Sequence, residues 1–413
     1  MIELDHNATT RPRPEVIEAM SRCMAEAWHN PSSVHRAGQS ARRAVELARA
    51  EVGRLLNAKA REIIFTGSGT ESIDLAIRGV LEASRLRSPQ KRTLITTRVE
   101  HHAVRDLAEH LVETGEADVR WAPVDAMGRV VPESLAELIV DTTALVSVQW
   151  ANNETGAIQP IERIGELCQA ARVPFHCDGT QWLGKMPTDL TSPTGTPTGT
   201  PADGEGAPPP SPMAIARAPF DLLTCSPHKF HGPKGVGVLW ARRGIALAPT
   251  VRGTQELGRR GGTENVPGIV GAGVAAAEAQ AWLADASERD RLAALRDRFE
   301  AGVLAACPGA AINSVGADRL WNTTNIGFPK LEAEALLLGL SERGLNASAG
   351  AACSSGSLEP SPVLLAMGTP PEIAHGSVRF SLGRDTTEGE IDQALAVVTE
   401  AVARLAGSSS ALG

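Results

Sequence analysis

The sequence predicts an α/β protein: a large domain with a mostly parallel sheet covered by helices, followed by a smaller α+β domain. Three observations support this fold class. Apolar, β-branched runs recur along the first part of the chain, segments with helical spacing separate them, and polar clusters follow the ends of the apolar runs. Such alternation of buried strands and helices is typical of parallel sheets with both faces covered.

The predicted strands are short runs bounded by turn residues. Their sequences are EIIFT (62–66), TLITT (93–97), ALVSVQW (144–150), PFHCD (174–178), DLLTCS (221–226) and GVGVLW (235–240). Between them, residues 71–81 and 161–172 carry apolar residues at helical spacing. The intervals between the runs leave room for the helices that connect parallel strands.

A second domain is expected after about Val266, where the chain becomes alanine-rich and helical, then strand-like around TTNIGF and SVRFSL. We assign residues 14–265 to the large domain, and residues 266–413 with the N-terminal segment 1–13 to the small one. A chain of 413 residues exceeds what one hydrophobic core usually supports.

Residues 191–219 form an unusual stretch, rich in Pro, Gly and Thr with a repeated TGTP unit. Such a composition cannot bury enough apolar surface to order itself. Because the strand and helix patterns continue on both sides, we interpret this stretch as an insertion within the large domain.

The overall composition is that of an ordinary globular protein, with 42% hydrophobic and 21% charged residues. No apolar run is long enough to cross a bilayer, and the start, MIELDHNATTRPRPEV, lacks an apolar signal segment. The net charge of −8, with no long basic cluster, offers no footprint for a polyanion. We therefore expect a cytoplasmic protein that binds neither membranes nor nucleic acids.

The cysteines are widely scattered and none form a C-x-x-C pair, which argues against a disulfide framework or a zinc ribbon. They are Cys23, Cys168, Cys177, Cys225, Cys307 and Cys353. Cys353 differs from the others because it lies in AACSSGS, where small residues leave little to bury it. We interpret it as a reactive thiol on a flexible loop rather than a structural cysteine.

Polar clusters follow five of the predicted strands at the end where each strand finishes. They are GSGTES (67–72), EHH (100–102), NNE (152–154), DGTQ (178–181) and SPHK (226–229). Because ligands of open α/β sheets bind at the carboxyl ends of the strands, we expect these clusters to meet in one site.

Lys229 is the candidate for covalent chemistry. It follows the apolar run DLLTC and lies between a histidine and a turn rich in Gly and Pro. A lysine attacks carbonyl groups only as the neutral amine, which burial and nearby positive charge favour. We interpret it as a Schiff-base lysine; the alternative is a surface lysine in a turn.

Two further clusters suit a charged cofactor. The GSGT turn opens a predicted helix, so its N–H groups and the hydroxyls of Ser68 and Thr70 could hold a phosphate, the alternative being a simple N-cap by Thr70. Asp178 follows an apolar run, where a carboxylate is costly unless it meets a cation or a donor. A protonated pyridine nitrogen would serve, as would a structural arginine.

The chain has no tyrosine and only 3% aromatic residues, so a flat cofactor ring would have to stack on histidine, tryptophan or phenylalanine. Because His101 and His102 are adjacent, we expect at most one of them to face the site. Gln181 and Asn153 offer amide groups for a phenolate oxygen, or alternatively for local backbone groups.

A metallohydrolase is the alternative from a different class of protein. The residues that could bind its metal are His101, His102, His176, Asp178, His228 and His231. Their spacings lack a helical face shared with a carboxylate, and a metal site leaves Lys229 without a purpose. A non-catalytic interaction protein is the third alternative. It is disfavoured because every candidate catalytic and cofactor-binding residue is present.

Taken together and in order, the motifs resemble those of cysteine desulfurases, which are pyridoxal-phosphate (PLP) enzymes of the class V aminotransferase-like group. The resemblance runs from the N-terminus to about Gly383. Its motifs are DHNATT (5–10), NPSSVHRAG (30–38), EIIFTGSGTES (62–72), EHHAV (100–104), NNETG (152–156), HCDGTQ (176–181), SPHKFHGPKGVG (226–237), RRGGTEN (259–265), AGAACSSGSLEPS (349–361) and SVRFSLGR (377–384). It implies the fold of the PLP-dependent transferases.

The resemblance also implies catalytic roles. Lys229 forms the Schiff base with PLP and later removes the substrate Cα proton. Asp178 keeps the ring nitrogen protonated, while His101 stacks on the ring and takes part in proton transfer. Cys353 receives the substrate sulfur as a persulfide.

The remaining matches are implied to bind cofactor or substrate. Gln181 and Asn153 hold the hydroxyl side of the ring, and Arg379, with Asn153 beside it, clamps the substrate carboxylate. The phosphate is bound by Gly69, Thr70, Ser226 and His228, and by Thr263 from the neighbouring subunit of a homodimer.

The implied reaction converts L-cysteine to L-alanine, with PLP as the electron sink. The persulfide sulfur then passes to an acceptor protein, such as a scaffold for iron–sulfur cluster assembly, a step implied by family analogy alone. A selenocysteine lyase and an aminotransferase of the same fold remain alternatives, in which Cys353 is less essential.

Three positions depart from the family pattern. His6 replaces the first asparagine of D-N-N-A-T-T, and the phosphate turn reads Gly67-Ser68 where Ser-Gly is common. Pro227 replaces a small residue, which we expect to stiffen the loop that carries Lys229.

Overall fold

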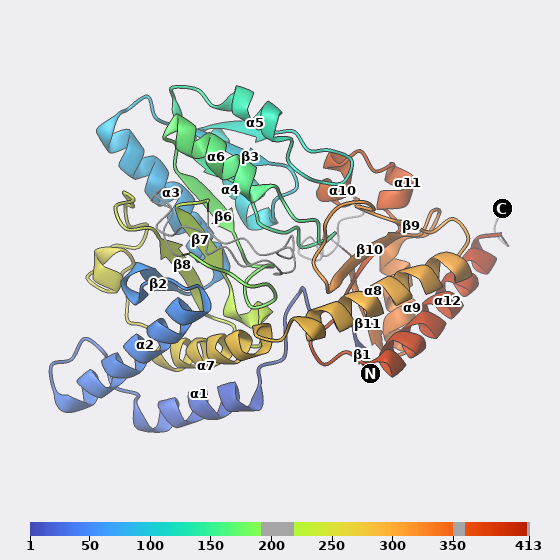
Figure 1. Cartoon of the computed structure of the whole chain (residues 1–413), viewed down its shortest axis with the longest axis horizontal. Helices are drawn as coiled ribbons and strands as arrows, with labels where there is room; N and C mark the ends of the chain where they lie inside the picture. Colours follow the sequence, from blue (N-terminus) through green and yellow to red (C-terminus); the bar gives the residue numbers. More distant parts are fainter. Residues whose placement is uncertain (191–218, 350–359, 411–413) are drawn as a thin grey trace, which may run out of the picture.

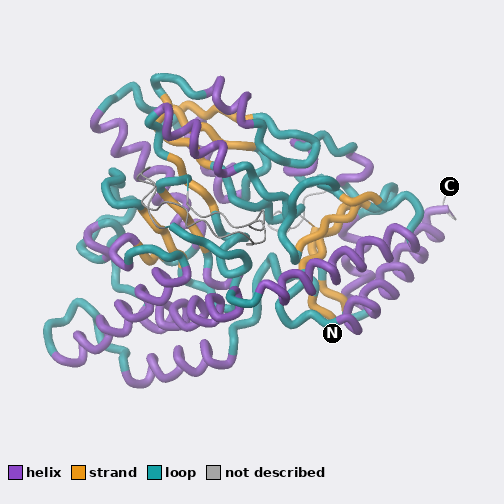
Figure 2. The backbone as a smooth tube through the Cα atoms, in the orientation of Figure 1, coloured by secondary structure: helices purple, strands orange, loops and turns teal. Residues whose placement is uncertain are grey.

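The computed structural model describes residues 1–190, 219–349 and 360–410. Figure 1 shows two lobes, a larger one built around an extended sheet and a smaller one that carries both ends of the chain. Figure 2 shows the strands in the interior of each lobe, with helices packed around them. No helix in the described ranges is both long and apolar enough to cross a membrane.

The sheet of the large lobe has seven strands in the order β2-β8-β7-β6-β5-β3-β4. Neighbouring strands are parallel except at β8, which runs antiparallel to both β2 and β7. The strands are β2 (Ile63–Thr66), β3 (Thr93–Thr97), β4 (Asp118–Ala122), β5 (Thr143–Ser147), β6 (Phe175–Asp178), β7 (Leu222–Cys225) and β8 (Gly237–Ala241). The predicted mostly parallel sheet of an α/β fold is confirmed.

Strand β4 is absent from the predicted strands because four of its five residues are exposed or half-buried and form no continuous apolar run. Its first residue, Asp118, is exposed and forms an ion pair with Arg92 at 2.8 Å. A strand with one free edge needs no continuous apolar run. The five residues of the interior strand β3, in contrast, are all buried.

Helices cover both faces of the large sheet, and each face has its own core. Ile95 and Val146 pack in the cluster that includes α1, α2, α6 and α7, whereas Leu94 and Leu145 pack with α3 and α4. This division follows from the alternation of side chains along a strand. The helices are α1 (Pro14–Glu26), α2 (Arg36–Leu55), α3 (Gly69–Arg87), α4 (His102–Glu113), α5 (Pro132–Leu138), α6 (Ile161–Ala171) and α7 (Val266–Leu283).

The small lobe is α+β, with a four-stranded antiparallel sheet, β12-β13-β10-β9, and a separate parallel pair, β1-β11. Through that pair the N-terminal residues join the small lobe. Its strands are β1 (Ile2–Glu3), β9 (Ala311–Ile312), β10 (Thr323–Gly327), β11 (Leu345–Asn346), β12 (Ser348–Ala349) and β13 (Ser377–Ser381). Its helices are α8 (Ala286–Ala306), α9 (Ala333–Glu342), α10 (Pro362–Ala366), α11 (Pro371–Ala374) and α12 (Glu388–Ser410).

The domain boundary predicted between residues 265 and 266 falls at the start of α7. Helix α7 packs against α1 and α2 beside the large sheet, and the next helix, α8, packs against α12 in the small lobe (Figure 1). Residues 191–218 of the predicted insertion lie outside the described residues, as does Cys353.

Candidate active site

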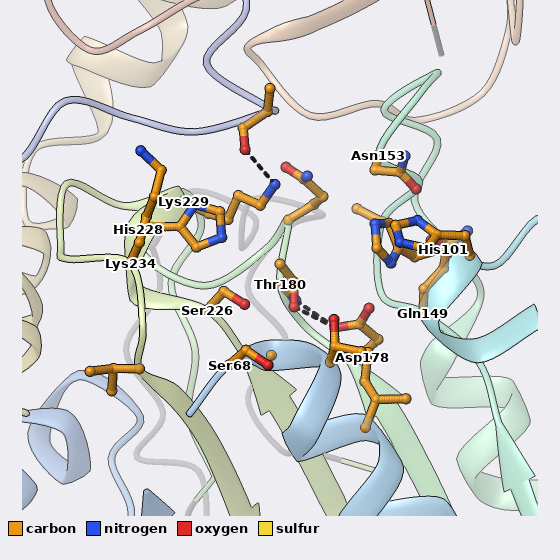
Figure 3. Close-up of a pocket in the computed structure, with 18 of the residues that line it drawn as sticks. Ser68, His101, Gln149, Asn153, Asp178, Thr180, Ser226, His228, Lys229 and Lys234 are labelled. Carbon is orange, nitrogen blue, oxygen red and sulfur yellow. Dashed lines mark hydrogen bonds between the residues drawn. The ribbon is translucent and has the colours of Figure 1, made fainter. Parts of the chain in front are cut away.

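A cavity of about 380 Å³ opens at the carboxyl edge of the large sheet. Each of the five polar clusters that follow a strand contributes residues to its lining, as the topology of a parallel sheet requires. Figure 3 shows these side chains converging from the different loops. Of the residues predicted for the site, those that line the cavity are Gly69, Thr70, His101, Asn153, Asp178, Gln181, Ser226, His228 and Lys229.

One end of the cavity is formed by the start of helix α3. Ser68 is its N-cap, with an extended backbone and an Oγ that accepts a hydrogen bond from the Glu71 N–H at 3.1 Å. The alternative prediction of a cap at Thr70 is therefore wrong by two positions. A Cβ at Gly69 would lie 2.0 Å from Ser226 Oγ, so a larger residue would force this hydroxyl to turn away from the start of α3. The first N–H groups of a long helix next to two hydroxyls suit a phosphate group.

Glu71 brings a negative charge to this helix start, and Arg260 neutralises it. The Arg260 guanidinium binds the Glu71 carboxylate at 2.6 and 3.2 Å. Burial raises the pKa of Glu71, but the hydrogen bonds from Arg260 and from the Gly67 N–H outweigh burial and leave the pKa below its usual value. Thr263, three residues beyond Arg260, is exposed and does not line the cavity of its own chain.

Lys229 ends a short 3₁₀ helix, Pro227–Lys229, that follows β7. Its Nζ donates to the main-chain oxygens of Asn7 and Ala8, both at 2.8 Å, which places the N-terminal segment over the cavity (Figure 3). Pro227, unusual for the family, occupies the first position of the 3₁₀ helix, where its fixed φ is favourable. Its carbonyl accepts from the N–H groups of Phe230 and Gly232, so the substitution fits the loop.

His228 lies between the cavity and the N-terminal segment. Its Nδ1 is 3.1 Å from Thr9 Oγ1, and its main-chain oxygen accepts from Thr10. Burial, with Lys229 and Lys234 nearby, lowers the pKa of His228 to about 4. The ring is therefore neutral at physiological pH, and it contributes hydrogen bonds rather than charge.

Asp178 ends β6 on the floor of the cavity and is 5% exposed. Its Oδ1 accepts three hydrogen bonds, from Thr180 N at 3.0 Å, Thr180 Oγ1 at 2.6 Å and Thr224 Oγ1 at 3.2 Å. Oδ2 accepts none from the described residues. Burial raises the pKa of Asp178, which these hydrogen bonds and Lys229 only partly offset. A buried carboxylate with one oxygen unused is suited to a cationic N–H donor.

A chain of buried hydrogen bonds continues behind Asp178. Thr224 Oγ1, which donates to Asp178, is 3.1 Å from His176 Nε2, and His176 Nδ1 is 2.8 Å from Ser147 Oγ. Burial lowers the pKa of His176 to about 3. Since Thr224 donates its only proton to the carboxylate, it accepts from Nε2, which fixes the neutral tautomer of His176.

His101 is the N-cap of α4, and its Nδ1 accepts from the Ala103 N–H at 3.2 Å. Burial, followed by His102 and Lys229, lowers the pKa of His101 to about 3, so the ring is neutral. Both His101 and His102 line the cavity, with ring centroids 3.8 Å apart. The expectation that at most one of them faces the site is therefore wrong, because the extended N-cap residue and the first helical residue do not point apart.

The predicted amide residues have different surroundings. Gln181 Nε2 donates to the Asn7 oxygen at 3.1 Å, and its Oε1 accepts from Lys185 at 2.7 Å. Asn153 Oδ1 is buried without a partner among the described residues. A buried acceptor left unused in a cavity lining is a position that a ligand donor can fill.

Arg379 comes from β13 in the small lobe and is 3% exposed. It does not line the cavity, but it adjoins it by donating to the Asn153 oxygen at 3.0 Å. Its second arm binds Asp5 Oδ1 at 2.7 Å. Asp5 was not singled out in the sequence, because no local pattern shows that residues so far apart in the chain are in contact.

Other residues near the cavity were also missed. Gln149 lines it from the end of β5, and its main-chain N–H donates to Glu100 Oε1 at 2.8 Å. Burial raises the pKa of Glu100 well above its usual value. Gln149 lies within the apolar run ALVSVQW, so the sequence pattern alone assigns its side chain to the core.

The metal alternative finds no support in the donor geometry. Within the described ranges, no three His, Cys, Asp or Glu side chains are grouped so that they could hold a metal ion. The two ring nitrogens of His176 form hydrogen bonds with Ser147 and Thr224. His231 Nδ1 forms one with the Arg11 oxygen at 2.9 Å.

The chain was compared with known proteins. The family described as Aminotransferase class-V matches residues 2–193 and 202–394. Cysteine desulfurase 2 of Trichormus variabilis is 45% identical over 406 residues, which cover 98% of this chain and 94% of that protein. Cysteine desulfurase NifS of Azotobacter vinelandii is 44% identical over 98% of this chain and 93% of its own.

Solved structures give the same result. A structure described as a NifS-like protein has a TM-score of 0.84 and 33% sequence identity, and covers 98% of this chain and 100% of its own. The PLP-dependent transferase fold predicted from the motifs is confirmed. The chain therefore belongs to the class V aminotransferase family and, within it, to the PLP-dependent cysteine desulfurases.

Proposed function

We propose that this protein converts L-cysteine to L-alanine with bound PLP and holds the sulfur as a persulfide on Cys353. The observation that carries the proposal is one cavity that contains an amine, a buried carboxylate with a free oxygen and a helix start, at Lys229, Asp178 and Gly69. These are the groups that a carbonyl carbon, a pyridine nitrogen and a phosphate require. Their combination fits PLP.

The residues that would hold PLP follow from their contacts. Ser68, Gly69, Thr70 and Ser226 provide N–H and O–H donors for the phosphate, and Asp178 Oδ2 can accept from the ring nitrogen. The neutral ring of His101 offers a flat face for stacking. When bound, PLP supplies an electron sink that makes the substrate Cα–H acidic.

Substrate binding falls to Arg379 and Asn153. Two of the five guanidinium N–H groups of Arg379 are used by the Asn153 oxygen and by Asp5, and its Nε lacks a partner among the described residues. The remaining donors, with the Asn153 amide, can bind a carboxylate. The substrate Cα is thereby kept near Lys229.

Proton transfer falls to Lys229 and His101. Lys229 Nζ would hold the cofactor aldehyde and, as an amine that lines the cavity, could take the Cα proton. His101 accepts from the Ala103 N–H at Nδ1, so the ring proton of the neutral imidazole is on Nε2. It can therefore donate a hydrogen bond at this atom, or pass a proton through the ring only if Nδ1 gains one as Nε2 gives one up.

Sulfur transfer falls to Cys353, which lies outside the described residues. Its thiolate attacks the substrate sulfur, an S–S bond forms and the C–S bond breaks. The electron pair of the C–S bond stays on the substrate carbon, which takes up a proton to become the methyl group of alanine. The terminal sulfur then passes to an acceptor, with iron–sulfur cluster assembly as the proposed destination in the cytoplasm.

We further propose that the protein acts as a homodimer in which the partner's Thr263 completes the phosphate site. The support is that Thr263 of the same chain is exposed and does not line the cavity. Its neighbour Arg260 anchors this loop to the start of α3 through Glu71. Sedimentation of the Thr263→Ala variant and of the wild type, with PLP binding measured for both, tests this part.

The deciding experiment loads the purified protein with PLP and measures its visible absorption, then reduces it with borohydride and locates the label by mass spectrometry. We expect a yellow protein labelled at Lys229, which forms alanine and persulfide from cysteine. Cys353→Ser should keep the colour and lose sulfide release by about a hundredfold or more. A colourless protein would refute the assignment. Undiminished sulfide release by Cys353→Ser would remove the desulfurase assignment and favour a lyase such as a selenocysteine lyase, whereas loss of the amino group without sulfide release would favour an aminotransferase.

A further inference from the structure

Lys185 is a buried lysine that none of the steps above uses. It follows Gly184, whose left-handed backbone (φ 74°) and close approach to Phe230 bring the chain tightly under the Lys229 loop. Lys185 is 4% exposed, although it carries an amine. Long charged side chains are almost never buried to this extent unless a partner compensates them.

The partners of Lys185 are neutral amides. Its Nζ donates to Gln181 Oε1 and to Asn7 Oδ1, both at 2.7 Å. Within the described ranges it forms no ion pair with a carboxylate. The charged groups that face it are Lys229, Arg379 and Arg384, and burial together with these cations lowers the pKa of Lys185 well below its usual value. A buried amine among cations is costly, so it is a poor device for stability alone.

These contacts determine how the Gln181 amide is oriented. The Asn7 main-chain oxygen can only accept, so the Gln181 atom that faces it must be the nitrogen, and the atom that faces Lys185 Nζ is the oxygen. The Gln181 nitrogen then faces the other way and donates one N–H to the Asn7 main-chain oxygen at 3.1 Å. Gln181 lines the cavity and has one further N–H to offer there.

Asn7 is held in the same network. Its Oδ1 accepts from Lys185 and from Asn322 at 2.9 Å, which leaves its Nδ2 to donate to Thr323 Oγ1 at 2.9 Å. The main-chain oxygen of Asn7 accepts from both Gln181 and Lys229. Lys185 therefore anchors the segment that both cavity residues use.

We propose that Lys185 is a positioning residue, which locks the Gln181 amide so that this side chain presents an N–H donor, and never its oxygen, to the ring oxygen of PLP. The inference rests on the proposed function. It predicts that Lys185 favours the ionised form of that oxygen through Gln181, because a donated hydrogen bond stabilises the anion. No contact between Lys185 and the cofactor is required.

The test compares PLP-loaded wild type with Lys185→Met, which has similar bulk and cannot donate. We expect PLP to bind about tenfold more weakly, and the pH at which bound PLP loses the proton shared with its ring oxygen, read from the visible absorption, to rise by roughly one unit. Lys91→Met is the matched control, because Lys91 Nζ donates to the Thr143 oxygen away from the cavity. It should leave both values unchanged.

The same change is then made in a Gln181→Ala background, where we expect Lys185→Met to have no further effect on the absorption titration. If Lys185→Met alone leaves the titration unchanged, the inference is overturned. It is also overturned if Lys185→Met shifts the titration equally with Gln181 in place and in the Gln181→Ala background, since Lys185 would then act through its own charge. If Lys185→Met does not fold, Lys185→Gln replaces it, because this variant keeps a donor for one partner. We expect Lys185→Gln to give a smaller shift in the pH of the absorption titration, and the absence of any shift overturns the inference. Failure of the wild type to bind PLP would instead refute the proposed function.

Discussion

Two buried carboxylates in the large lobe have opposite surroundings. Glu256 accepts from both arms of Arg49 at 2.7 and 2.8 Å and from the Phe65 N–H at 3.0 Å. Asp178, buried to a similar degree, forms no ion pair in the described part of the chain and uses only one of its oxygens. Glu256 has a cationic partner within the protein, whereas Asp178 Oδ2 accepts no hydrogen bond from the described residues.

The backbone supports the same distinction. Glu256 and Leu257 adopt left-handed conformations, with φ of 49° and 58°, that are uncommon for residues with side chains. The ion pair with Arg49 holds this conformation in place. Around Asp178, in contrast, the surrounding residues follow ordinary strand and turn geometry. Three hydrogen bonds and the nearby Lys229 only partly offset the free energy cost of burying its charge.

The largest expected effect is on stability. Arg49→Met leaves the Glu256 carboxylate buried and unpaired, so we expect the free energy of unfolding to fall by about 3–5 kcal/mol. Urea titration of the PLP-free protein measures it. The control is Arg54→Met, which removes a more exposed ion pair with Glu51 and should cost well under about 1 kcal/mol. Equal decreases in the free energy of unfolding of the two variants would show that the buried ion pair of Glu256 is no more important for stability than a more exposed one.

Asp178→Asn should weaken PLP binding and leave stability nearly unchanged. The amide keeps an oxygen for Thr180 and Thr224 but carries no charge, so we expect unfolding of the PLP-free protein to be unchanged or slightly more costly. PLP binding should weaken about a hundredfold, because a hydrogen bond to a charged group is lost. Equilibrium dialysis with PLP checks the affinity. A large loss of stability with intact PLP binding would make Asp178 a structural residue like Glu256.

Gly69→Ala tests whether the phosphate end of the cavity, like Asp178, serves PLP binding rather than stability. The added Cβ would meet Ser226 Oγ at 2.0 Å, so this hydroxyl must turn away and one donor for the phosphate is displaced. We expect about tenfold weaker PLP binding with little loss of stability. Gly389→Ala, where nothing lies within 4 Å of the new carbon, is the matched control and should bind PLP normally.

The last expected effect is spread over several pH units and concerns the pH dependence of stability. The pKa of His101 falls from 6.5 to about 3 on folding, so the unfolded chain binds a proton that the folded chain does not. Stability should therefore be lost as the pH falls below about 6.5, down to about 3. His101→Asn keeps an N-cap acceptor and removes this proton, so its unfolding free energy should fall less steeply between pH 7 and pH 4. An identical slope would contradict the burial of this ring.

Much of this arrangement follows from local sequence patterns. Interior strands such as β3 and β6 read as continuous apolar runs, and the rule that ligands bind at the carboxyl ends of parallel strands brings their polar clusters together. The edge strand β4 escaped detection because half-exposed residues do not form such a run.

Other parts of the site depend on contacts between distant segments. Lys185 lies four positions from the cavity residue Gln181, but its second partner, Asn7, lies far away along the chain. His176 is likewise linked to the distant Thr224, so no local pattern shows these networks. The exposure of His102 to the cavity depends on where α4 begins, and helix boundaries are the least certain part of any pattern. Sequence therefore predicts the residues that would touch a cofactor better than those that hold them in place.

The N-terminal segment has a consequence for how the protein matures. Asp5 meets Arg379 across 374 positions, and β1 pairs only with β11 among the described strands, while Asn7 and Ala8 carry the carbonyls above Lys229. The N-terminal segment is therefore fully docked only after residues up to 379 have emerged from the ribosome, although Asn7 and Ala8 can already meet the Lys229 loop. Loading with the vitamin-derived aldehyde should accordingly be a late, post-translational event.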